Sequence, residues 1–198
     1  MAKNNKSNSI AGKNILLGVT GSIAAYKAPE LVRLFIYGGA NVKCILTANG
    51  SRFVTSLTLE TVSKNKVFTD MFEEFEHSIE HIALSDWADI ALIAPASADT
   101  IAKIASGRAE DLLSSTVLSM NKPMLVAPAM NERMWANPAT AYNVEKLRSY
   151  GYSIVGPGCG ELACGTSGMG RLANLEEIIQ AVKNNLTIFK SGVRASTL

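Results

Sequence analysis

Residues 15–39 read ILLGVTGSIAAYKAPELVRLFIYGG. The apolar run Ile15–Val19 leads through a short turn into a segment whose apolar residues recur every three or four positions, and the pair Gly38-Gly39 ends that segment. A strand followed by a turn and an amphipathic helix is the repeating unit of parallel α/β sheets. This stretch therefore predicts an α/β fold, a Rossmann-like arrangement of three layers around an open parallel sheet.

Later segments of the chain support the same fold. Four of them are short and apolar nearly throughout, which is typical of strands covered by helices on both faces: Val42–Leu46, Ile90–Ala94, Met124–Ala127 and Ser153–Val155. An apolar stripe over residues 175–186 predicts a C-terminal helix, and Asn174 with Glu177 resembles a capping box at its start. We expect one domain over residues 14–186, between a polar N-terminal extension (1–13) and a polar tail or truncated linker (187–198).

The composition excludes several classes of protein. The chain carries 19 basic and 17 acidic residues, and this balance argues against binding to nucleic acid through its phosphates. No apolar run reaches the roughly 18 residues that a membrane span needs, and residues 1–13 lack the apolar centre of a signal peptide. Three cysteines, an odd number, argue against a disulfide framework. We expect a cytoplasmic protein that binds neither membranes nor nucleic acids.

The loops after the strands are the candidate ligand-binding segments, because open parallel sheets bind ligands at the carboxyl ends of their strands. The first loop, residues 18–24, opens a helix and suits a phosphate at the helix N-terminus. Its spacing is not the G-x-G-x-x-G of dinucleotide sites, and the second strand is followed by Thr47 instead of an acidic residue for a ribose. Ser22 and Thr47 therefore favour a mononucleotide over NAD, although a tight turn with a capping serine also explains the first loop.

Two further loops mix small, polar and apolar residues. In residues 94–100 (APASADT), small side chains let a flat ring approach the backbone, and three polar side chains could bond the edge of that ring. The alternative there is a proline turn with a helix cap. In residues 128–135 (PAMNERMW), two methionines and a tryptophan accompany Asn131, which predicts an apolar pocket with one amide for a polar substrate. The start of a core helix explains the apolar residues but does not need Asn131.

The histidines and two of the cysteines complete the set of candidates. His77, His81, Cys159 and Cys164 suggest a zinc site, but the C-x4-C spacing is looser than in structural zinc sites, and we expect no metal. Histidine is instead the natural general base near neutral pH. The Gly-rich segment 158–171 is either a surface loop or a flap that closes over a ligand, and its thiols and arginine favour the flap.

Five segments together resemble the homo-oligomeric flavin-containing cysteine decarboxylases, over residues 13 to about 181. They are GVTGSIAAYKAPELVR (18–33), HIALSDWAD (81–89), PASADT (95–100), PAMNERMW (128–135) and ACGTSGMGR (163–171). The segment PAMNERMW, placed after the histidine segment, is the most specific of the five. The resemblance is strongest to the members that act in coenzyme A biosynthesis.

This resemblance implies a flavoprotein fold, FMN as the cofactor, and roles for particular residues. His81 matches the catalytic base, Asn131 matches the residue that holds the substrate carboxylate, and Cys164 matches the acid that completes the reaction. The positions that match the FMN site are Ser22, Ile23, Ala24, Thr47, Ser97, Ala98, Asp99, Thr100 and Ala129. The positions expected to contact the substrate are Asn131, Met134, Ala163, Cys164 and Arg171. Asp99 departs from the family pattern, because many members have asparagine there.

The implied activity is the decarboxylation of 4'-phosphopantothenoylcysteine to 4'-phosphopantetheine. Oxidation of the substrate thiol by the flavin gives the departing carboxylate an adjacent electron sink, and loss of carbon dioxide leaves an enethiol that is then reduced. The resemblance also implies a homotrimer with its flavin sites between subunits, so that His81 and Asn131 act across an interface. Assembly of trimers into dodecamers, and a phosphopantothenate–cysteine ligase domain on the full-length chain, stay open.

Four alternatives to this activity differ in their sequence features. Lantibiotic peptide decarboxylases share the fold but stop at the enethiol and lack a cysteine at the position of Cys164. Flavin prenyltransferases lack PAMNERMW and the histidine segment. Non-catalytic FMN-binding regulatory proteins of yeasts carry long acidic tails, and residues 187–198 are not acidic. A generic nucleotide-binding module would lack the visible absorption of a flavin.

Overall fold

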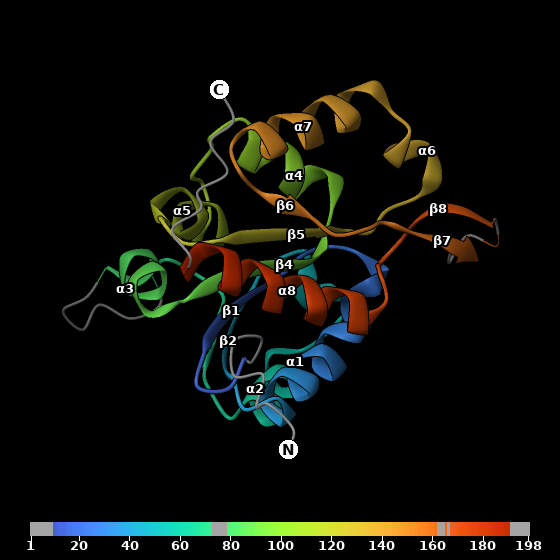
Figure 1. Cartoon of the computed structure of the whole chain (residues 1–198). Helices are drawn as coiled ribbons and strands as arrows, with labels where there is room; N and C mark the ends of the chain where they lie inside the picture. Colours follow the sequence, from blue (N-terminus) through green and yellow to red (C-terminus); the bar gives the residue numbers. More distant parts are fainter. Residues whose placement is uncertain (1–9, 73–78, 162–164, 166, 191–198) are drawn as a thin grey trace, which may run out of the picture.

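A six-stranded parallel sheet forms the centre of the protein, in a computed structural model that describes residues 10–72, 79–161, 165 and 167–190 (Figure 1). The strands are β1 (Asn14–Val19), β2 (Asn41–Leu46), β3 (Val67–Phe68), β4 (Ile90–Ala96), β5 (Met124–Pro128) and β6 (Ser153–Ile154). The strand order β3-β2-β1-β4-β5-β6 confirms the predicted open parallel sheet. All five predicted strands are present. The sequence did not predict β3, because a strand of two residues shows no detectable alternation of apolar residues.

Helices cover the sheet on both faces and make the three predicted layers (Figure 1). They are α1 (Ala28–Tyr37), α2 (Ser56–Ser63), α3 (Glu80–Trp87), α4 (Ala98–Ala105), α5 (Leu112–Ser119), α6 (Glu132–Trp135), α7 (Pro138–Ser149) and α8 (Leu175–Lys190), with two short 3₁₀ helices, η2 (Ile23–Lys27) and η3 (Gly50–Arg52). Successive side chains of a strand point to opposite faces. Ile15 and Leu17 of β1 accordingly join the core under α1, α2 and α8, whereas Leu16 joins the core under α3, α4, α5 and α7.

The spacing of apolar residues predicts one helix from Ala24, but the structure has two helical segments there, η2 and α1. Pro29 stands in the first turn of α1 and has no N–H to donate to the preceding turn. The chain therefore forms η2 with 3₁₀ hydrogen bonding and becomes α-helical only at Ala28, whose N–H donates to Ala25. The site-forming turn after β1 thus leads into η2 before α1 begins.

Both expected domain borders lie inside ordered structure. Ile10, within the expected polar extension, is buried and packs so closely on Gly38 that a Cβ there would lie 2.6 Å from Ile10 Cδ1. At the other end, α8 continues through Thr187 to Lys190, beyond the expected end of the domain, and Asn174 Nδ2 donates to Glu177 Oε1 at 3.5 Å beside its start. Of the helices in the described part of the chain, none is both long and apolar enough to cross a membrane.

A separate antiparallel pair, β7 (Gly158–Glu161) and β8 (Ser167–Arg171), lies where the Gly-rich flap was predicted. This β7–β8 hairpin extends from the side of the molecule next to α6 (Figure 1). The sequence did not predict strands here, because glycines alternate with other residues and leave no apolar period. The hairpin places Arg171 at the end of β8, close to the carboxyl edge of the sheet.

Candidate active site

Backbone hydrogen bonds join the loops at the carboxyl edge of the sheet into one surface. The Thr47 N–H donates to the carbonyl of Val19 at 3.1 Å, which ties the loop after β2 to the loop after β1. The Ala129 N–H donates to the carbonyl of Ala96 at 3.1 Å, which ties the loop after β5 to the loop after β4. Segments that are far apart in the sequence therefore hold fixed positions relative to one another.

A cavity of about 730 Å³ opens between these loops and the β7–β8 hairpin, and we call it the hairpin cavity. Its lining includes nine of the predicted cofactor and substrate residues: Ser22, Ile23, Ala24, Ser97, Ala98, Ala129, Asn131, Met134 and Arg171. Gly21, Tyr26, Lys27, Met130, Glu161, Gly165, Gly170 and Leu172 complete the lining. Predicted cofactor residues and predicted substrate residues thus face the same space.

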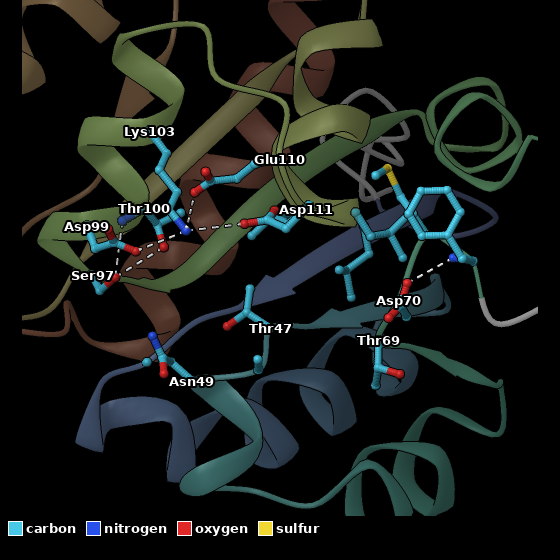
Figure 2. Close-up of a pocket in the computed structure, with 17 residues that line it drawn as sticks. Thr47, Asn49, Thr69, Asp70, Ser97, Asp99, Thr100, Lys103, Glu110 and Asp111 are labelled. Carbon is cyan, nitrogen blue, oxygen red and sulfur yellow. Dashed lines mark hydrogen bonds and ion pairs between the residues drawn. The ribbon is translucent and has the colours of Figure 1, made fainter.

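A second cavity of about 410 Å³ lies beside the first, and we call it the lysine cavity (Figure 2). It is lined by the other predicted cofactor residues, Thr47, Asp99 and Thr100, together with Ser97. Gly21 and Ser97 line both cavities, so the two adjoin at the loops after β1 and β4. Together the cavities form an elongated site with one polar end and one more apolar end.

Lys103 stands at the centre of a group of carboxylates in the lysine cavity (Figure 2). Its Nζ lies 2.9 Å from Glu110 Oε1, 3.3 Å from Asp99 Oδ2 and 3.4 Å from Asp111 Oδ2. The hydrogen bond to Glu110 is the main reason that the pKa of Lys103 rises to about 12. The Asp99 carboxylate, where many family members have a neutral amide, is therefore paired with a cation one helical turn away.

Several predicted cofactor residues also serve as helix caps, as the simpler structural interpretation predicts. Ser97 Oγ accepts from the Thr100 N–H at 3.3 Å and caps α4, and Ser22 Oγ accepts from the Ala24 N–H at 3.4 Å and caps η2. The Thr47 hydroxyl donates to the Val19 carbonyl and accepts from the Gly50 N–H. The Thr47 hydroxyl therefore stabilises the turn that contains it, a role that the sequence did not predict.

Asn131 is held in a defined orientation at the mouth of the hairpin cavity. It caps α6, and its Oδ1 accepts from the Arg133 N–H at 2.9 Å. An asparagine amide nitrogen only donates hydrogen bonds, and a carboxylate only accepts them. The role of Asn131 toward a substrate carboxylate stays a prediction.

The hairpin cavity suits a flavin, which has a flat apolar ring and an anionic end, because its lining carries Lys27 and Arg171 against one carboxylate, Glu161. Each of the two volumes lies in the usual range of ligand pockets, about 300–1,000 Å³. The loops approach closely at Gly21, where a Cβ would lie 2.6 Å from that of Asn49. A larger residue at Gly21 would fill the junction between the two cavities.

His81 does not line either cavity. It is the second residue of α3, which packs on α5, and its carbonyl accepts from the Ser119 hydroxyl at 3.4 Å. Figure 1 shows α3 and α6 on opposite sides of the molecule, so that His81 and Asn131 of one chain are not neighbours. Exposed apolar side chains accompany both, Ile79 and Ile82 beside His81 and Met134 beside Asn131.

Several candidates lie outside the described residues or away from the site. Ala163, Cys164 and His77 are not among the described residues. Cys159 is exposed on β7, and Cys44 is buried in β2, where burial raises the pKa of its thiol to about 12. Within the described ranges no group of three or more potential metal ligands occurs.

Sequence reasoning missed some of the residues that shape the site. Gly170 and Met130 join the hairpin to the loop after β5, since the Met130 N–H donates to the Gly170 carbonyl at 2.9 Å. Lys103 had a usable signal, because it stands four residues after Asp99 and so shares a helix face with it. Its contacts with residues 110 and 111 depend on the turn between α4 and α5 and carried no such signal.

We expect Gly170→Ala to disturb the site far more than Gly168→Ala. Gly170 has φ +144°, and a Cβ there would lie 2.2 Å from the Met130 carbonyl oxygen. The backbone strain alone costs about 1–3 kcal/mol. At Gly168 the Cβ would meet the Glu132 carboxylate at 2.4 Å, but that exposed side chain can move aside. The unfolding temperature should fall and KM should rise in Gly170→Ala, and both should stay near wild type in Gly168→Ala. Equal effects of the two substitutions would contradict this expectation.

Comparison with known proteins places the chain in a family. The model of the flavoprotein family matches residues 3–187. The coenzyme A biosynthesis bifunctional protein CoaBC of Bacillus subtilis is 43% identical over 174 residues, which is 87% of this chain and 43% of that protein. CoaBC of Escherichia coli K12 is 46% identical over 165 residues, 83% of this chain and 41% of that protein. The chain thus spans less than half the length of the curated relatives it matches.

Two solved structures agree with this placement. One is a cysteine-to-serine mutant of PPC decarboxylase in complex with pantothenoylaminoethenethiol, with a TM-score of 0.79, 32% identity, and coverage of 87% of this chain and 97% of that one. The other is the FMN-dependent cysteine decarboxylase SpaF, with a TM-score of 0.80, 30% identity, and coverage of 93% of this chain and all of that one. The chain therefore belongs to the flavoprotein family, within its group of flavin-dependent cysteine decarboxylases.

Proposed function

We propose that the protein decarboxylates 4'-phosphopantothenoylcysteine to 4'-phosphopantetheine with FMN as its cofactor, as a cytoplasmic enzyme of coenzyme A biosynthesis. One observation carries the proposal. Residues matched to FMN binding and residues matched to substrate binding come from four separate segments and line one cavity between the loops and the hairpin. The likeness to CoaBC and to PPC decarboxylase supports this choice of substrate.

In this proposal FMN supplies a reversible two-electron oxidation, which converts the substrate thiol into a group that stabilises the loss of carbon dioxide. The chain's own residues bind the substrate and move its protons. His81 takes the proton of the substrate thiol. Asn131 orients the carboxylate without a charge, so that the departing group is not stabilised in its ground state. Cys164 returns a proton to the enethiol, a role supported by the enethiol held in the cysteine-to-serine mutant of PPC decarboxylase.

The proposal requires that two copies of the chain build each site. Helix α3, which carries His81, and helix α6, which Asn131 caps, lie on opposite sides of one chain, so these two residues reach the same substrate only if they come from different copies (Figure 1). The exposed apolar side chains beside each of them provide surfaces that an interface would cover. We propose a homotrimer with shared sites, and trimers are also the units from which a dodecamer would be built. A ligase domain on a longer chain is compatible with this assembly, and the longer relatives are named bifunctional proteins of coenzyme A biosynthesis.

A second candidate is the decarboxylation of a C-terminal cysteine in a peptide, favoured by the likeness to SpaF. Turnover of phosphopantothenoylcysteine and of a peptide ending in cysteine, measured side by side on the purified protein, separates the two. We expect turnover of the first with release of carbon dioxide and no turnover of the second. Turnover of the peptide alone would overturn the proposed substrate, and absence of bound FMN from the purified protein would overturn the cofactor.

A further inference from the structure

Thr20 occupies a fully buried position between the loop after β1 and the loop after β4. Its Oγ1 donates to the carbonyl of Pro95 at 2.7 Å and accepts from the N–H of Ser97 at 2.9 Å. One hydroxyl thus bonds both a donor and an acceptor of the neighbouring loop. Both bonds span more than seventy residues of sequence, so they hold tertiary structure and not a local turn.

The β4 backbone explains why a side chain is needed there. The pairing of β4 with β5 shifts register between Ile93 and Ala96, so the carbonyl of Pro95 lies outside the regular ladder. The Thr20 hydroxyl satisfies that carbonyl and also the N–H of Ser97, two residues further along the chain. A buried polar backbone group without a partner is costly, so removal of the hydroxyl favours a shift of the loop.

The two residues that Thr20 controls are those at the junction of the cavities. Gly21 follows it directly in the chain, and Ser97 is bonded to it, and these two line both the hairpin cavity and the lysine cavity. Ser97 also caps α4 through the Thr100 N–H. A shift of the Ser97 backbone would therefore move the wall that the two cavities share and the first turn of α4.

We propose that Thr20 is a positioning residue for flavin binding, which acts by fixing Ser97 against Gly21. The inference rests on the binding of a flavin by this site. Thr20 does not face the cavities itself, and its effect passes through the Ser97 loop. Valine has a methyl group in place of the hydroxyl, so Thr20→Val removes both hydrogen bonds and changes the side-chain volume little.

The test compares Thr20→Val with Thr116→Val. Thr116 is also fully buried, and its Oγ1 donates to the Leu112 carbonyl at 2.7 Å, so this hydrogen bond lies within α5 and does not join two loops. Each apoprotein is titrated with FMN, and binding is followed by the quenching of flavin fluorescence, while thermal unfolding is measured without FMN. We expect Thr20→Val to weaken FMN binding about tenfold or more. Thr116→Val should lower the unfolding temperature and leave FMN affinity within about threefold of wild type.

Two further variants keep the result interpretable. Thr20→Ser retains the hydroxyl and should bind FMN nearly as well as wild type. Thr20→Ala also removes the hydroxyl and leaves a smaller side chain, and it should lose FMN affinity as Thr20→Val does. It provides the test if Thr20→Val does not fold. FMN affinity at the wild-type level in Thr20→Val or Thr20→Ala would overturn the role of Thr20 and leave the proposed function intact. An equal loss of FMN affinity in Thr116→Val would do the same. A wild-type protein that binds no FMN would overturn this inference together with the proposed function.

Discussion

Replacement of Cys164 by serine is expected to stop the reaction after carbon dioxide has left. In the proposed reaction, oxidation and decarboxylation depend on the flavin, His81 and Asn131 and need no proton from Cys164. A thiol has a pKa of about 8.5, whereas the serine hydroxyl is a far weaker acid. The Cys164→Ser variant should therefore release carbon dioxide once, retain a reduced flavin, and accumulate the enethiol, which is two hydrogens lighter than phosphopantetheine. Anaerobic mixing followed by mass spectrometry measures all three.

The matched control for this experiment is Cys159→Ser. Cys159 is exposed on β7 and matches no position with a proposed role. Its replacement should leave turnover unchanged. Full conversion to phosphopantetheine by Cys164→Ser would show that another group donates the proton. No carbon dioxide from Cys164→Ser would show that Cys164 is required before the carboxylate leaves.

Two inactive variants are expected to restore each other when they assemble together. His81→Asn lacks the proposed base and Asn131→Ala lacks the group that holds the carboxylate, so each alone should lose activity about a hundredfold or more. If every site of a trimer takes His81 from one copy and Asn131 from the next, each mixed trimer has both residues intact in about a third of its sites. Co-expression with two different tags and double purification provides the mixed oligomer for the assay.

The outcome distinguishes a shared site from a site within one chain. A mixed oligomer that stays inactive would contradict the shared site, because sites built within one chain would all lack one residue. His77→Asn mixed with Asn131→Ala is the control, and His77→Asn alone should be active. Light scattering on the same samples should give a mass that is a multiple of three protomers, and an active monomer would contradict the trimer.

The sequence predicted the sheet well because its signals are local. Each central strand, such as Ile90–Ala96, is a short apolar run, and the loop after each strand follows directly from the strand boundary. The topology of parallel sheets then places those loops at one edge. The gathering of residues from loops after β1, β4 and β5 around one cavity was predictable for the same reason.

Features that depend on tertiary distance were not predictable from one sequence. Nothing in the order of the chain indicates that His81 and Asn131 lie on opposite sides of the fold. Thr20 carries no signal of its own, because its partners lie about seventy-five residues away and become neighbours only when β1 and β4 pair. The ion pairs of Lys103 with the turn between α4 and α5 follow from packing, and the hairpin strands follow from backbone pairing without an apolar period.

The most direct test of the proposed activity is the molar ratio of carbon dioxide released to phosphopantetheine formed, measured in the absence of oxygen. The proposed reaction consumes no external oxidant or reductant, since the electrons taken from the substrate thiol return to the product. The purified protein, mixed anaerobically with an excess of phosphopantothenoylcysteine, should release one carbon dioxide for each phosphopantetheine over many turnovers, and its flavin should return to the oxidised spectrum. Unchanged substrate, or a reaction that ends after one equivalent per site, would contradict the proposed function.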